Sequence, residues 1–78
     1  MEVKSLAQLH KGEKGRIVAI HPGESALRLM EIGLVIGADI ELLATSPFGD
    51  PIAVKLDDFS VSLRKEDAKQ IEVHITNK

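Results

Sequence analysis

The stretch TSPFGDPIAV, residues 45–54, lies near the middle of the chain and separates two runs of strand-forming residues. Pro47 and Pro51 each fix φ, and Gly49 permits backbone conformations that other residues avoid. The carboxylate of Asp50 can accept hydrogen bonds from nearby backbone N–H groups. We therefore predict that this stretch is a rigid reversal between two antiparallel strands.

The tip of the predicted reversal carries Phe48, one of only two aromatic residues in the chain. Hairpins favour a two-residue turn, and this stretch is longer. A large apolar ring at the tip either folds back over the body of the domain or meets a partner. The sequence leaves both interpretations open.

Outward from the reversal, the alternation of apolar and polar residues predicts short strands. The predicted elements are a capped turn at 5–9, a helix at 24–32, a turn at 66–68, and strands at 16–20, 39–46, 52–56, 60–64 and 71–75. A small sheet usually removes its exposed edges by closing on itself. We therefore predict one mainly all-β domain over residues 1–78. Its expected architecture is a small SH3-like β-barrel of about five strands with one short α-helix between the first two long strands.

The predicted helix at 24–32 carries more apolar surface than a small core needs. Polar residues recur at intervals of three and define one face: Ser25, Arg28 and Glu31. Apolar residues cover much of the remaining arc: Ala26, Leu27, Leu29 and Met30. Gly33 stands where a helix often ends in the left-handed conformation. Either the sheet wraps around this helix, or part of the arc contacts a partner.

The composition describes one small domain with an almost entirely aliphatic core. Of the 78 residues 44% are hydrophobic, and the formal net charge is −2. The absence of cysteine excludes disulfides and thiolate metal sites and favours a reducing cytoplasm. We expect no signal peptide and no direct membrane insertion, because no apolar run approaches the roughly 20 residues that span a bilayer. From Glu31 to Asp58 the carboxylates face only Lys55, which indicates a solvated acidic surface.

No residue pattern in the chain indicates catalysis or a cofactor. The serines lack the histidine partners of nucleophilic catalysis, so we expect a protein that is not an enzyme. His10, His21 and His74 lack the spacing of metal ligands, and we expect no intrinsic metal site. We expect His74 to point to solvent from its strand. The negative net charge and the scarcity of aromatic residues argue against a nucleic-acid-binding surface.

Four motifs follow one another along the chain: SLxxLxxGxxGxI from residue 5, LRLMEIGLxxGxxI from residue 27, PFGDP from residue 47 and SLRxxDAxxIxV from residue 62. Together they cover nearly the whole chain. In this order and register they resemble the FeoA family, ferrous iron transport protein A. The chain departs from the family pattern at Ile32, where Met or Leu is frequent, and at Asp58-Phe59, which replaces a glycine-bearing turn.

The resemblance implies an SH3-like barrel that serves as a cytoplasmic accessory or regulatory protein of ferrous iron uptake. The implied partner is FeoB, a membrane transporter with a cytosolic GTP-binding domain. The same fold occurs at the C-terminus of iron-dependent repressors of the DtxR type, so a regulatory module of such a repressor is an alternative. Residues 11–18 faintly resemble the first strand of KOW-type barrels, so a translation-type RNA-binding barrel is a further alternative.

A protein without chemistry of its own acts by favouring one conformation of its partner. We expect the outer arc of the helix and the loop at 47–51 to form the docking face, for FeoB or for a second copy in a weak homo-oligomer. The candidate partner-binding residues are Leu27, Arg28, Met30, Leu34, Pro47, Phe48 and Asp50. The candidate structural turn residues are Gly33, Gly37, Gly49 and Pro51.

Overall fold

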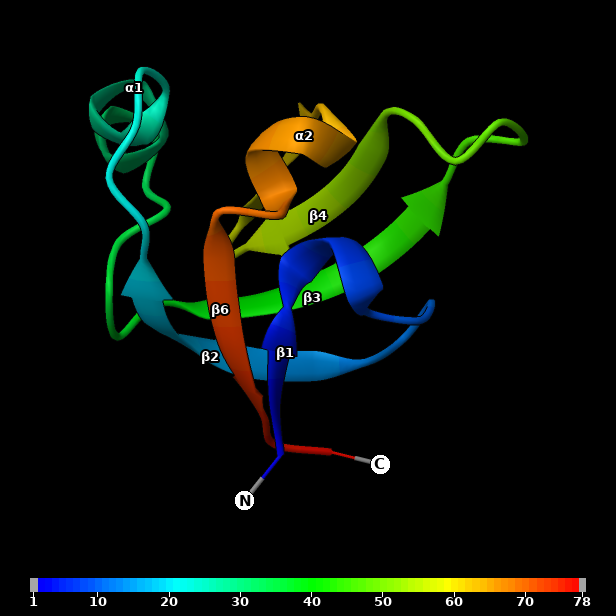
Figure 1. Ribbon diagram of the computed structural model, residues 1–78. Helices are drawn as coiled ribbons and strands as arrows, with labels where there is room; N and C mark the ends of the chain where they lie inside the picture. Colours follow the sequence, from blue (N-terminus) through cyan, green and yellow to red (C-terminus); the bar gives the residue numbers. More distant parts are fainter. Residues whose placement is uncertain (1, 78) are drawn as a thin grey trace.

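Six strands form one antiparallel sheet in the computed structural model, which describes residues 2–77 (Figure 1). The strands are β1 (Val3–Ser5), β2 (Lys14–Ile20), β3 (Asp39–Thr45), β4 (Ile52–Leu56), β5 (Phe59–Leu63) and β6 (Ile71–Ile75). One 3₁₀ turn, η1 (Leu6–Gln8), follows β1, and two short helices, α1 (Ala26–Glu31) and α2 (Lys65–Ala68), precede β3 and β6. The strand order across the sheet is β1-β6-β2-β3-β4-β5.

Alternate residues of the strands point into one apolar core. The inward residues of β4 and β6 are Ile52, Val54, Leu56, Ile71, Val73 and Ile75. From α1 only Leu29 is buried, and η1 contributes Leu6. No polar or charged side chain of the described residues is buried. The fold is therefore held by apolar packing and strand pairing, without an internal polar network.

The structure has six strands, whereas the sequence pattern predicts about five. The additional strand is β1, which pairs with β6 from Val3↔His74 to Ser5↔Glu72. Three residues are too few to show a period of two, so only the tertiary pairing identifies this strand. β1 and β5 are the two ends of the sheet, and within residues 2–77 no ladder joins them. The helix does lie between β2 and β3, as predicted.

The structure has two helices where the sequence predicts one helix and a turn. α1 begins at Ala26, because residues 24 and 25 belong to the turn that precedes it, and it ends at Glu31 rather than residue 32. The turn predicted at 66–68 is the four-residue helix α2. In the part of the chain that the structure describes, no helix is long and apolar enough to cross a bilayer.

Gly15 allows β6 to approach β2 closely. A Cβ added at Gly15 would overlap Val73 Cγ1 and the carbonyl oxygen of His74. The residue is buried and pairs with Ile40 on one side and Ile75 on the other. Its role is close backbone packing at the centre of the sheet, because its φ does not lie in the left-handed region.

Candidate interaction surface

Two hydrogen bonds between Ser46 and Asp50 close the loop that joins β3 to β4. Ser46 Oγ donates to the carbonyl oxygen of Asp50 (2.6 Å) and accepts from its N–H (3.0 Å). The N–H of Gly49, a residue with φ +84°, donates to the Ser46 carbonyl oxygen (2.8 Å). The peptide bond that precedes Pro51 is cis. The loop is thus the rigid reversal that the sequence predicts.

Asp50 also fixes this loop to the start of α2. Its Oδ1 accepts a hydrogen bond from the backbone N–H of Lys65, the first residue of α2, at 2.9 Å. The first N–H groups of a helix have no partner within the helix, and a carboxylate acceptor is favourable there. The side chain of Asp50, predicted as partner-binding, therefore has a structural role in this fold.

Phe48 extends from the tip of the loop into solvent. Its side chain is 96% exposed, and Pro47 beside it is exposed as well. A ring that folded back over the sheet would lose most of its accessible surface. The interpretation that Phe48 folds back over the domain is therefore wrong. Pro47 and Phe48 remain candidate contact residues.

A second exposed apolar surface lies on α1 and the segment that follows it. We call it the α1 apolar surface, and its members are Leu27, Met30, Ile32, Val35, Ile36 and Phe59. Leu27 is 67% exposed and Met30 46%, whereas Leu29 between them is buried. Phe59 joins this surface from β5, because its Cζ lies 3.5 Å from the point where a Cβ on Gly33 would stand. Of the four residues in the predicted apolar arc, Leu29 packs into the core, Ala26 is half-buried, and Leu27 and Met30 face solvent.

Leu34 does not belong to this surface, and its assignment as a partner-binding residue is wrong. It is fully buried. Gly33 ends α1 with φ +107°, and the turn sends Leu34 into the core, where its N–H donates to the Leu29 carbonyl oxygen at 3.0 Å. Gly37, with φ +95°, makes a second turn and donates its N–H to the Ile17 carbonyl oxygen at 2.8 Å. Both glycines therefore have the turn role that the sequence predicts.

Arg28 joins α1 to α2. Its Nη2 donates to Asp67 Oδ2 at 3.0 Å, and the Asp67 side chain is largely shielded from solvent. A shielded carboxylate is less screened by water and salt than a fully exposed one. Arg28, predicted as a contact residue, therefore helps to hold α1 against α2.

The α1 apolar surface and the loop at 46–51 do not form one continuous face. Figure 1 shows α1 at one end of the molecule and this loop at the other, with α2 between them. The single docking face expected from the sequence is therefore divided into two separate exposed positions. A partner that touches both must extend across the whole domain.

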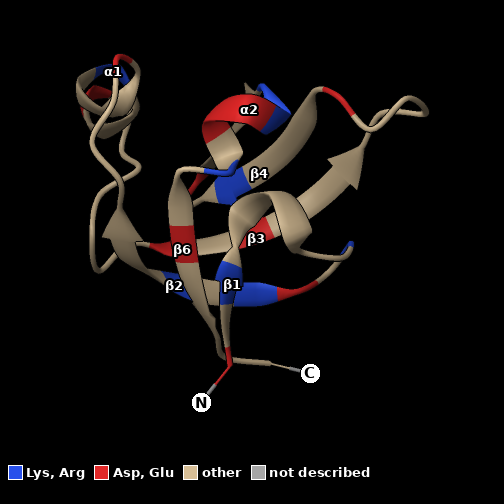
Figure 2. Ribbon diagram, in the orientation of Figure 1, with Lys and Arg blue, Asp and Glu red and all other residues tan. Residues whose placement is uncertain are grey.

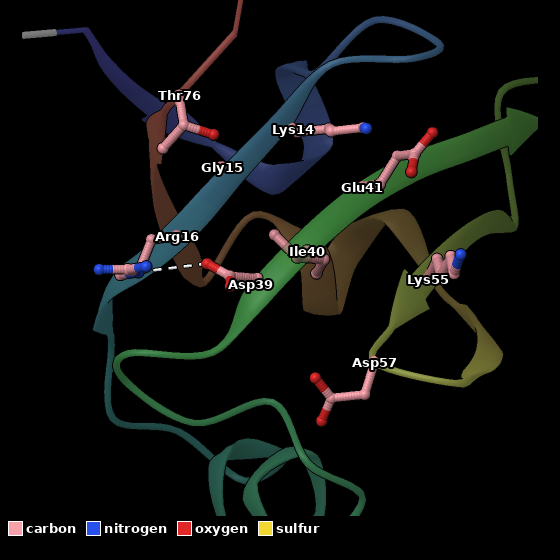
Figure 3. Close-up of a pocket in the computed structure, with 9 residues that line it drawn as sticks. All are labelled: Lys14, Gly15, Arg16, Asp39, Ile40, Glu41, Lys55, Asp57 and Thr76. Atoms are coloured by element: carbon pink, nitrogen blue, oxygen red, sulfur yellow. Dashed lines mark hydrogen bonds and ion pairs between the residues drawn. The ribbon is translucent and has the colours of Figure 1, made fainter.

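An open cleft of about 470 Å³ lies over β2, β3 and β4 (Figure 3). Charged side chains of both signs line it, basic on β2 and β4 and acidic on β3 and after β4: Lys14, Arg16, Lys55, Asp39, Glu41 and Asp57. Arg16 Nε donates to Asp39 Oδ1 at 3.2 Å, and Glu41 pairs across the sheet with both lysines. Acidic and basic residues are also interspersed on the rest of the ribbon (Figure 2). The acidic segment predicted at 31–58 thus lies beside basic residues of β2. The sequence pattern does not predict the cleft, because three separate strands build it.

The three histidines lie on different elements and do not converge. His10 Nδ1 lies 3.2 Å from Glu13 Oε1, and His21 Nε2 forms a hydrogen bond with Glu72. His74 is half-buried on β6 and alternates with the buried Val73 and Ile75, so it lies on the strand face away from the core. Within residues 2–77 no group of three or more His, Cys, Asp or Glu side chains is placed to hold a metal ion.

Glu13 binds the N-terminal strand to the connection that follows it. Its Oε1 accepts hydrogen bonds from Lys4 Nζ (2.9 Å) and from the backbone N–H of His10 (2.6 Å). The Lys4 hydrogen bond, followed by that of His10, lowers the pKa of Glu13 from 4.5 to about 2. The carboxylate is only 19% exposed, and its hydrogen bonds to Lys4 and to the His10 backbone give it a role in the fold.

Comparison with known families matches residues 4–75 to the FeoA domain. A fusion protein of Porphyromonas gingivalis, which joins Fe(2+) transport protein A to the Fe(2+) transporter FeoB, is 38% identical over 71 residues. The match covers 90% of this chain and 8% of the fusion protein. The chain therefore corresponds to one small part of that longer relative.

Solved structures of similar proteins share the fold. An FeoA-like protein from Clostridium acetobutylicum is 32% identical with a TM-score of 0.91, over 100% of this chain and 92% of that one. FeoA of Stenotrophomonas maltophilia, described as a procaryotic SH3 domain protein and solved in complex with zinc, is 25% identical with a TM-score of 0.79, over 90% and 88% of the two chains. A manganese-dependent transcriptional repressor is 23% identical with a TM-score of 0.86, over 94% and 41%. The repressor shows a likeness of fold alone.

Proposed function

The chain belongs to the FeoA family, and from that premise we propose that it is a cytoplasmic accessory protein of ferrous iron uptake that binds a FeoB-type transporter. The fused relative carries this proposal, because there the matching segment and a FeoB transporter are parts of one chain. A fusion keeps two proteins at high effective concentration, which supports a functional interaction between their separate counterparts.

The proposed action is binding rather than catalysis. The protein would stabilise one conformation of the transporter's cytosolic part, and it can shift that equilibrium only by its difference in affinity for the two states. In this proposal the curved sheet serves as a small SH3-like barrel, a rigid scaffold for exposed contact residues, although β1 and β5 are not paired.

The α1 apolar surface is the docking face in this proposal. Clusters of exposed large apolar residues mark interaction sites, and six such residues lie on α1, on the segment after it and at the start of β5. Leu27 and Ile36 are the most exposed of these residues, at 67% each. The Arg28–Asp67 contact ties α1 to α2 and the left-handed turn at Gly33 ends the helix, so little ordering would be needed on binding.

Calorimetry with the cytosolic GTP-binding part of the same organism's FeoB-type transporter, with and without a GTP analogue, tests both the proposed interaction and the proposed docking face. Wild-type protein should bind, and Leu27→Glu and Met30→Glu should each bind at least about tenfold more weakly, because a carboxylate would be desolvated in an apolar interface. Val3→Glu is the matched control, since Val3 is 42% exposed and lies on β1.

The outcomes test the proposed FeoB interaction and the proposed docking surface independently. Failure of the wild-type protein to bind any nucleotide state of the transporter fragment would refute the proposed function. Unchanged binding by folded Leu27→Glu and Met30→Glu variants would refute the α1 apolar surface and leave the function standing.

A further inference from the structure

β5 provides a regular strand edge at one end of the sheet. The other end, β1, has only three residues and continues directly into η1, whereas β5 has five. The β2–β6 and β3–β4 ladders each contain a register shift. The β4–β5 ladder keeps one register from Ile52↔Leu63 to Leu56↔Phe59. The outer side of β5 is therefore a straight edge without a bulge.

Ser60 and Ser62 direct their backbone N–H and C=O groups away from β4. Hydrogen-bonded and non-hydrogen-bonded pairs alternate along an antiparallel ladder, and a two-residue turn closes on a hydrogen-bonded pair. Here that closing pair is Leu56↔Phe59, so Ser60 and Ser62 fall in non-hydrogen-bonded positions against β4. Both serines are exposed, and among residues 2–77 no strand other than β4 pairs with β5.

The edge lacks the features that usually prevent strand addition. Natural sheets protect their edges with charged residues, proline, bulges or very short strands. Residues 59–63, FSVSL, contain neither a charged residue nor a proline. An added strand can therefore form hydrogen bonds here without displacing a side chain of the edge.

The charges that flank β5 have opposite signs at its two ends. Asp57 and Asp58 precede the strand, and Arg64 and Lys65 follow it. Arg64 has φ −69° and ψ 142°, so the extended backbone continues through it. Within residues 2–77 neither Asp58 nor Arg64 forms an ion pair. Such a segment is complementary to an antiparallel copy of itself.

We propose that the β5 edge binds β5 of a second copy of this chain, antiparallel, about a two-fold axis at Val61. Ser60 of each copy then lies opposite Ser62 of the other as a hydrogen-bonded pair. Asp58 lies in the turn before β5 and Arg64 directly follows β5, so the same register brings Asp58 of one copy to the end of the strand pair where Arg64 of the second copy lies. A parallel arrangement would bring like charges together, which is unfavourable. The two-fold axis closes the assembly at a dimer with one continuous sheet.

This interface is small, so the dimer should be weak. Stable protein interfaces bury about 1,200 Å² or more, and a pair of five-residue strands buries less. We expect self-association to become measurable at roughly 0.1–1 mM protein and low salt. The proposal does not rest on FeoB binding.

A charge-reversal cycle followed by sedimentation equilibrium tests the proposal. Asp58→Arg and Arg64→Asp should each weaken dimerisation at least about fivefold, because each sets like charges opposite one another at two symmetric places. The double variant Asp58→Arg/Arg64→Asp should return to within about twofold of wild type, since its charges are again complementary. Glu24→Arg and Lys11→Asp are matched controls, which change the net charge equally at exposed positions outside β5. In hydrogen exchange, the amides of Ser60 and Ser62 should become protected as protein concentration rises.

Several results would overturn the proposal. One is a protein that stays monomeric at roughly millimolar concentration and low salt. Another is a dimer that both charge reversals leave unchanged, or one that Leu27→Glu alone dissociates, which would place the contact on the α1 apolar surface. Protection of Ser60 and Ser62 only after a FeoB fragment is added would assign the edge to that partner and would also refute self-pairing.

Discussion

The carboxylate of Asp50 accepts a hydrogen bond from the backbone N–H of Lys65, 15 residues later in the chain. One side chain therefore completes the β3–β4 loop and satisfies a donor at the start of α2. This contact gives a structural reason for an aspartate in the PFGDP motif, without reference to any partner.

Removal of this acceptor should destabilise the fold by about 1 kcal/mol, the usual effect of losing a helix-capping side chain. Asp50→Ala is the variant, and chemical unfolding with urea measures its free energy of unfolding. Asp50→Asn should lose less, because the amide oxygen can still accept from the Lys65 N–H. Glu24→Ala is the control at an exposed acidic position, expected to change stability by less than about 0.5 kcal/mol. Equal stability of Asp50→Ala and Glu24→Ala would contradict the capping role.

Gly15→Ala should destabilise the centre of the sheet more strongly, by about 1–3 kcal/mol, because the added methyl group overlaps Val73 and the His74 backbone. Gly23→Ala provides the control. A Cβ at Gly23 meets no atom within 4 Å, and its φ does not lie in the left-handed region. Thermal unfolding of the two variants compares them directly. A Gly15→Ala protein as stable as Gly23→Ala would show that β2 and β6 can separate without loss.

The sequence predicts the elements of this fold better than it predicts their exposure. Alternation in residues 52–56 and 71–75 identifies β4 and β6 because a strand buried on one face imposes a period of two. The periodicity of α1 does not show which part of its apolar arc is buried. Leu29 is buried while Leu27 and Met30 are exposed, because this six-residue helix contacts the domain through one narrow side.

The remaining features depend on contacts between distant parts of the chain, which the sequence pattern does not show. β1 exists only through its pairing with β6, whose residues lie 67 to 71 positions later in the chain. Leu34 follows a helix and looks like part of its apolar arc, yet the left-handed turn at Gly33 sends it inward. Phe59 reaches the α1 apolar surface from β5, a neighbour that no local pattern indicates.

The two phenylalanines should respond differently to truncation. Phe48→Ala should change the free energy of unfolding by less than about 0.5 kcal/mol, since its ring makes almost no contact with the domain. Phe59→Ala should destabilise by about 1 kcal/mol or more, because its half-exposed ring packs beside Gly33 and loses that contact. Urea unfolding measures both. A large loss of stability in Phe48→Ala would mean that the ring folds back over the sheet in solution.

Glu13 should make the stability of the protein depend on pH in the acid range. Its pKa of about 2 in the folded state lies below its ordinary value of 4.5. The stabilisation is therefore fully present above pH 4.5 and is lost as the pH falls toward 2. Glu13→Gln should be less stable than wild type at neutral pH, and the difference should shrink steadily across this window. Glu24→Gln, the matched control, should follow the wild-type curve.

Direct titration separates Glu13 from the other carboxylates. The side-chain carboxyl resonance of Glu13, followed by NMR, should titrate near pH 2, and Lys4→Met should raise that midpoint because the Lys4 hydrogen bond is the largest cause of the lowered pKa. A midpoint near 4.5 in the wild-type protein would mean that Lys4 and His10 do not hold the carboxylate in solution. In that case Glu13→Gln would also leave the acid unfolding curve unchanged, since equal pKa values in the folded and unfolded states give no dependence on pH.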